Sequence, residues 1–69
     1  MKDNNIYSQI IDVMKFRQAH VAPLKTRVIA DDVGVSIHQT RYYLEELRKL
    51  NIVERSVEGR GKATYWLLY

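Results

Sequence analysis

The stretch that decides the fold reads Thr26-Arg-Val-Ile-Ala-Asp-Asp-Val33, then Gly34-Val35-Ser36, then a longer run from Ile37 to Leu50. Apolar residues recur at helical spacing in the first and last of these pieces, which predicts two helices. Gly34 stands where the first helix must end, because glycine adopts a left-handed backbone at little cost. Ser36 and Gln39 have the spacing of a capping box, so the second helix is predicted to begin at Ile37.

Further residues define the ends and inner faces of these helices. Thr26 is expected to be the N-cap of the helix over 26–33. Asn51 is expected to take a left-handed conformation after the helix over 37–50. The inward positions of that second helix are predicted to be Thr40, Tyr43, Leu44, Leu47 and Leu50.

Upstream, another helix is predicted to start near Asn4 or Asn5, since either side chain can cap it. Its apolar stripe comprises Ile6, Ile10, Val13 and Met14, widened by Ile11 and Phe16. Lys15, Arg17 and His20 are expected late in this helix, where cations complement its dipole. Pro23 ends anything helical before it, so residues 21–25 form a connector or a very short strand.

Downstream, the pattern changes to that of a β-hairpin. Residues 52–57 are β-branched and alternating, and residues 63–69 are rich in aromatic and aliphatic side chains. The turn between them, Glu58-Gly-Arg-Gly-Lys62, holds two glycines and two cations. Trp66 and Leu68 are expected to face the core, whereas Tyr65, Leu67 and Tyr69 face outward or cover an edge; a one-residue slip in register would reverse this.

The predicted order is therefore α-α-α-β-β, an α+β fold in one domain over residues 1–69. Three helices followed by a two-stranded hairpin are typical of a winged helix-turn-helix, whose second paired helix enters the major groove. The alternative is an ordinary three-helix bundle in which Gly34 merely ends a helix. A basic hairpin tip counts against that alternative, because a bundle has no need of one.

Composition adds only weak constraints on function. The chain has no cysteine, which excludes disulfides and thiolate metal sites and fits a reducing cytoplasm. We see no membrane-length apolar run and no signal peptide. Net charge is +3, which favours an anionic partner only slightly, so the placement of the cations must carry the argument.

The outer surface of the helix over 37–50 is the best candidate for reading DNA. The start of a recognition helix meets base edges; there Gln39 can pair with adenine and Arg41 with guanine. Ser36, at the helix start, can offer its hydroxyl to a phosphate. The predicted DNA-binding residues of this helix are Ser36, His38, Gln39, Arg41 and Tyr42. The alternative for each is a solvated helix surface.

Glutamates limit how far this contact should extend along the helix. Glu45 and Glu46 would repel phosphates, so the groove contact is expected to stop near Tyr42. Both glutamates are placed to pair with Arg41, Arg48 or Lys49 at helical spacing.

The hairpin tip supplies a second candidate contact. Arg60 and Lys62 are predicted to bind phosphates or the minor groove; the alternative is a soluble turn whose charges discourage edge pairing. Lys25 and Arg27 are equally consistent with phosphate contact and with a solvated surface.

Catalytic and metal-binding interpretations find little support. His20 and His38 are the only histidines, and a metal site of Asp31, Asp32 and His38 is a remote alternative. A single-stranded stacking platform on the C-terminal aromatic residues is another minor alternative. We expect a non-enzyme without cofactor or metal.

The strings Thr40-Arg-Tyr-Tyr-Leu44 and Gly61-Lys-Ala-Thr-Tyr-Trp66 resemble those of the PapI/FaeA-type regulators of fimbrial operons in enteric bacteria. The resemblance covers residues 26–68, with a looser match before it and a longer connector over 17–25. It implies a winged-helix DNA-binding regulator that acts with the leucine-responsive regulatory protein at control regions containing adenine-methylated GATC sites. The recognition helix then maps to residues 37–50 and the wing to residues 58–62.

The sequence therefore predicts a cytoplasmic, sequence-specific transcriptional regulator of a fimbrial operon that binds double-stranded DNA. The alternative is a winged helix that binds a larger DNA-bound regulator and has little DNA affinity of its own. A monomer that needs a partner is expected, because one winged helix of this size offers little binding surface.

Overall fold

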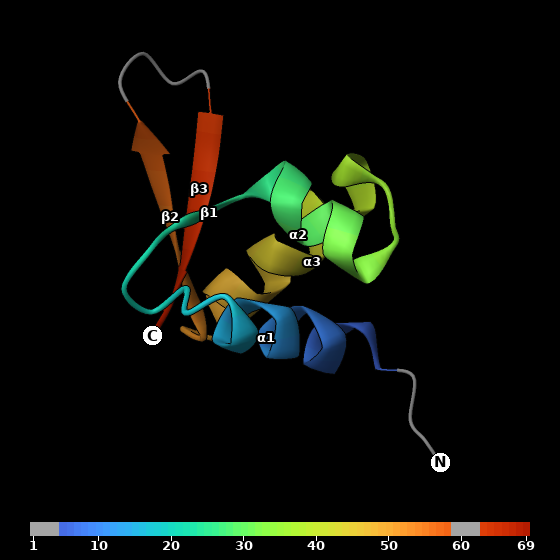
Figure 1. The fold of residues 1–69 in the computed structure, drawn as a ribbon, viewed down its shortest axis with the longest axis horizontal. Coiled ribbons are helices and arrows are strands. Elements are labelled where there is room, and N and C mark those ends of the chain that lie inside the picture. The colour runs from blue at the N-terminus through green and yellow to red at the C-terminus, as the bar shows by residue number, and fades with distance from the viewer. Residues whose placement is uncertain (1–4, 59–62) are drawn as a thin grey trace.

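The computed structural model describes residues 5–58 and 63–69, which form three helices and a small antiparallel sheet (Figure 1). The elements follow the order α1 (Ile6–Phe16), β1 (Leu24–Lys25), α2 (Thr26–Val33), α3 (Ile37–Lys49), β2 (Val53–Glu58) and β3 (Ala63–Leu68). The predicted α+β fold class is confirmed, and the arrangement fits a winged helix-turn-helix. The predicted order lacked β1, although a very short strand had been one of two options for that segment. No helix among the described residues is long and apolar enough to cross a membrane.

The sheet has the strand order β1-β3-β2, so β3 is its central strand. Trp66 in β3 pairs with Leu24 on one side and with Arg55 on the other. Figure 1 shows β2 and β3 standing beside the helices as a long hairpin, with β1 leading directly into α2. This order ties the start of α2 to the hairpin through the short β1.

Trp66 is at the centre of the core, as predicted, and its side chain is fully buried. Its indole N–H donates to the Thr26 hydroxyl at 2.8 Å, and that hydroxyl lies 3.5 Å from the carbonyl oxygen of Thr64. The prediction of Thr26 as a cap is wrong: Lys25 holds the N-cap position, without a side-chain cap bond. Thr26 is instead a buried polar link between α2 and β3. The other large buried side chains include Ile10, Met14, Ile29, Leu44 and Val53.

The first helix begins as predicted, because the Asn5 side chain accepts from the backbone N–H of Tyr7 at 2.9 Å. It ends earlier than expected, at Phe16, so Arg17 and His20 lie beyond it. Phe16 is 87% exposed and does not widen the apolar stripe. Two residues after Met14, it projects about 160° away from that buried side chain around the helix axis.

The joint between α2 and α3 matches the prediction. Gly34 has a φ of 86° and donates its N–H to the carbonyl of Ala30, and Ser36 caps α3. Asn51 takes the expected left-handed conformation, with a φ of 62°. Leu50, however, is 68% exposed and was wrongly placed in the core, because α3 ends at Lys49.

In β3 the prediction that Trp66 faces the core and Tyr69 faces solvent is confirmed, but Tyr65 and Leu67 are partly buried, as Leu68 is. Leu68 packs against the core. Both strands lie within one residue of their predicted ends.

Candidate nucleic-acid interface

The start of α3 is built by the Ser36 cap. The Ser36 Oγ accepts from the backbone N–H of Gln39 at 3.1 Å and lies 3.4 Å from the Gln39 side-chain oxygen. The Thr40 hydroxyl donates to the Ser36 carbonyl at 2.8 Å. These bonds fix the first turn, so the side chains that project from it have a defined direction.

Four predicted contact residues are exposed along this first part of α3: His38, Gln39, Arg41 and Tyr42. Each residue turns the helix by about 100°, so His38 and Tyr42 lie opposite the buried Thr40 face. Arg41 lies on one flank and Gln39 on the other, about 160° apart. His38 and Tyr42 therefore form the middle of the outward surface, with Arg41 and Gln39 at its two edges. The Gln39 side-chain oxygen also lies beside the Ser36 hydroxyl, at 3.4 Å.

Tyr42 is 60% exposed, and its ring packs against a second tyrosine. It packs edge-on against Tyr43 with ring centres 5.6 Å apart, and Tyr43 packs in the same way on Tyr7 in α1 at 5.4 Å. This row of three tyrosines supports the exposed ring at the outer surface of α3.

Arg41 carries an uncompensated charge within the part of the chain that the structure describes. No described carboxylate forms an ion pair with it, whereas Lys49 pairs with Glu46 at 3.3 Å. The expectation that Glu46 forms an ion pair with a lysine or arginine of the same helix is thus confirmed. Arg41 remains available to bind an external anion.

Glu45 forms ion pairs with two arginines, one of which the sequence did not indicate. Its two carboxylate oxygens accept separately from Arg48 Nε in α3 and from Arg55 Nη1 in β2, both at 2.8 Å. Burial alone would raise the pKa of this carboxyl, but the bonds and charges of both arginines hold the pKa below its ordinary value of 4.5. Pairing with Arg48 was expected from helical spacing; pairing with Arg55 depends on how β2 crosses α3, which no local pattern encodes.

The remaining predicted cations divide into two groups. Arg60 and Lys62 lie outside the described residues, so their predicted role stays a prediction. Lys25 and Arg27 are exposed at the start of α2, where Lys25 pairs with Tyr65 across the sheet. Among residues 5–58 and 63–69 neither forms an ion pair with a carboxylate.

The alternative of a metal site at Asp31, Asp32 and His38 has no support among the described residues. Asp32 is held by the Arg17 side chain, with Arg17 Nη2 3.2 Å from one carboxylate oxygen and Nε bound to the other. Across 5–58 and 63–69, no three His, Asp or Glu side chains gather so as to hold a metal ion.

Comparison with known proteins places this arrangement in a family. The sequence model of the family described as FaeA-like protein matches residues 1–69. The chain belongs to the FaeA-like family. The resemblance read from the two strings, at 40–44 and 61–66, is confirmed.

Several Escherichia coli proteins are similar to this FaeA-like chain. The P fimbrial regulatory protein KS71A is 42% identical over 57 residues, covering 83% of this chain and 73% of the relative. The major pilus subunit operon regulatory protein matches with the same identity and coverage. The F1845 fimbrial adhesin operon regulatory protein DaaF is 36% identical over 55 residues, covering 80% of this chain and 73% of the relative. All three are named as regulatory proteins.

Proposed function

We propose that this chain regulates transcription of a fimbrial operon by binding duplex DNA through the outward surface of α3. One observation carries the proposal most directly: Arg41 is exposed beside the capped start of α3 and has no carboxylate partner among the described residues. Relatives in the family that are named as regulatory proteins of a pilus subunit operon and of a fimbrial adhesin operon supply the operon class.

In this mechanism α3 enters the major groove with its first two turns. Arg41 donates to a guanine edge, His38 meets a neighbouring base, and Tyr42 packs on a sugar or bonds a phosphate. Ser36 and Gln39 act mainly by holding the helix start in place; its backbone N–H groups favour a nearby phosphate. Arg60 and Lys62 are proposed to contact the backbone from the wing.

We also propose that the protein works in the cytoplasm beside the leucine-responsive regulatory protein, at methylation-sensitive GATC sites. That partnership is what the family resemblance implies. It suits a domain with a small binding surface, whose affinity for DNA alone is expected to be modest.

The test is a salt series of binding to fimbrial control-region duplexes and to scrambled duplexes, followed by fluorescence anisotropy. Arg41→Ala is expected to weaken specific binding about tenfold and to relax the sequence preference, because a base contact is lost. Lys15→Ala is the matched control: Lys15 is also exposed and has no ion pair among the described residues, but it lies in α1. Equal behaviour of the two variants would overturn the assignment of α3.

A second candidate is a protein-interaction module that binds a larger DNA-bound regulator. The observation in its favour is an apolar hollow of about 390 Å³ between α1 and the end of α3, bordered by the 68% exposed Leu50. Tyr7, Ile11 and Ile52 also line it.

Two variants separate this candidate from DNA binding. Leu50→Asp is expected to abolish recruitment by the leucine-responsive regulatory protein on DNA if the hollow is the contact, whereas Phe16→Asp, at another exposed apolar residue, leaves recruitment intact. Direct duplex binding that is unaffected by the partner and by Leu50→Asp would exclude the second candidate.

A further inference from the structure

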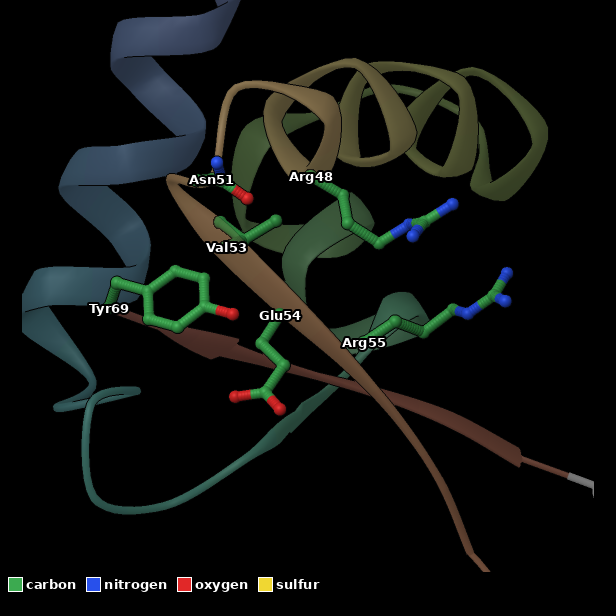
Figure 2. A pocket seen from close by; sticks show the side chains of 6 residues that line it. All are labelled: Arg48, Asn51, Val53, Glu54, Arg55 and Tyr69. Atoms are coloured by element: carbon green, nitrogen blue, oxygen red, sulfur yellow. The ribbon is translucent and has the colours of Figure 1, made fainter.

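Two arginines from different elements meet at one carboxylate beyond the predicted DNA-binding residues. Arg48 belongs to α3 and Arg55 to β2, and each donates to a different oxygen of Glu45 at 2.8 Å. Figure 2 shows both side chains extending to the same side, away from Tyr69, with which they line a shallow hollow. Glu45 thus joins the recognition helix to the hairpin.

The exposure of the three side chains leaves the arginines open to a ligand. The Arg48 and Arg55 side chains are each 44% exposed, whereas that of Glu45 is 26% exposed. An arginine has five N–H donors, and each of these two directs a single nitrogen at Glu45. Among the described residues the other donors of these two side chains have no acceptor, so they can bind an oxyanion outside the cluster.

The charges of the cluster suit one phosphodiester. Two guanidinium groups and one carboxylate leave a net charge of +1, and a phosphodiester carries a single negative charge. Burial does not neutralise Glu45, because the bonds and charges of the two arginines outweigh it and lower the pKa of the carboxyl below its ordinary value of 4.5. Glu54, the other nearby acid, points to the opposite side of β2 in Figure 2, as alternation along a strand requires.

We propose that Arg48 and Arg55 together bind one backbone phosphate of duplex DNA, and that Glu45 positions both guanidinium groups for it. This inference rests on the proposed DNA-binding function and extends it. The DNA contact then continues past Tyr42 to the end of α3 and onto the hairpin. Glu45 is not only a repulsive charge on this surface, because it sets the direction of two cations.

The experiment measures duplex affinity against salt for Arg48→Ala, Arg55→Ala and the double variant. Each single variant is expected to bind about tenfold more weakly, to specific and scrambled duplexes alike. The slope of log affinity against log salt should shrink by about 0.9 for the shared phosphate. Since both arginines serve one phosphate, the double variant should lose little more than either single variant. In a Glu45→Ala background, that coupling between the two arginines should disappear.

Lys49→Ala is the control, because Lys49 is a cation of the same helix turn whose partner is Glu46. Arg55→Lys keeps the charge and the fold but not the planar set of donors, so it should retain the salt slope and lose affinity. Unchanged slopes for both alanine variants, with Arg41→Ala still impaired, would overturn this inference and leave the proposed function standing. Full additivity of the two arginines would also overturn it, and absence of duplex binding by the unaltered protein would remove both proposals.

Discussion

At the scale of single residues, the hydroxyl of Thr26 decides how the largest core side chain is accommodated. It accepts the buried indole N–H of Trp66 at 2.8 Å. Thr26→Val keeps the shape and removes the acceptor, which leaves that N–H without a partner. We expect the free energy of unfolding to fall by about 1–3 kcal/mol, measured by urea denaturation.

Thr26→Ser is the informative comparison for that variant. It keeps the hydroxyl and removes only a methyl group, so its free energy of unfolding should fall much less than that of Thr26→Val. If the serine variant unfolded as easily as the valine variant, the methyl packing of Thr26 and not its hydrogen bond would be the source of the effect. The sequence placed Thr26 at the right helix end but assigned its oxygen to the wrong donor, because the Trp66 partner is 40 residues away.

At the scale of elements, Gly34 ends α2 and sets the direction in which the chain continues to α3. Its φ of 86° is a conformation that residues with a Cβ adopt at a cost, while an added Cβ would meet no described atom within 4 Å. Gly34→Ala is therefore expected to lower the free energy of unfolding by roughly 1–2 kcal/mol through backbone strain alone. Gly34→Asn should cost less, since asparagine tolerates the left-handed region, and thermal unfolding of the two variants gives the comparison. A neutral alanine variant would contradict this account.

The same elements show which parts of the fold a sequence can predict. Gly34, the Ser36 cap and the left-handed Asn51 are local signals, and all three appear where the pattern put them. Two residues at helix ends were wrongly placed in the core: Phe16 lies about 160° around the helix from the buried Met14, and Leu50 follows the last residue of α3. Within the candidate site, the start of α3 was visible as a pattern, but the link from Glu45 to Arg55 was not, because it requires the path of β2 across the helix.

At the scale of the whole molecule, two ion pairs among the described residues join segments that are distant in sequence. Arg17, directly after α1, pairs with Asp32 in α2, while Glu45 in α3 pairs with Arg55 in β2. The hydrogen bond from Arg17 is the main cause of the lowered pKa of Asp32, whose ordinary value is 3.8. The pKa of Glu45 is also lowered, against its burial, by Arg48 and Arg55. Both carboxyls therefore bind protons more weakly in the folded chain than in the unfolded chain.

The sign of the pH dependence follows from that difference. A lowered pKa contributes stability that is complete above the unfolded value and is lost as pH falls through the folded value. Stability attributable to these pairs should thus be constant from pH 7 to about 5 and decline from about 4.5 downward, first through Glu45 and then through Asp32. Urea unfolding at a series of pH values measures this loss of stability. Because all four side chains are partly exposed, the total change is expected to be modest.

Two variants test the prediction. Asp32→Asn and Glu45→Gln should each flatten the acid side of the plot of stability against pH. Asp12→Asn is the control, at an exposed acid of α1 without an ion pair among the described residues, and should leave the plot unchanged. If the stability of all three variants fell with acid as steeply as that of the unaltered protein, these two ion pairs would contribute nothing to the acid sensitivity of the fold.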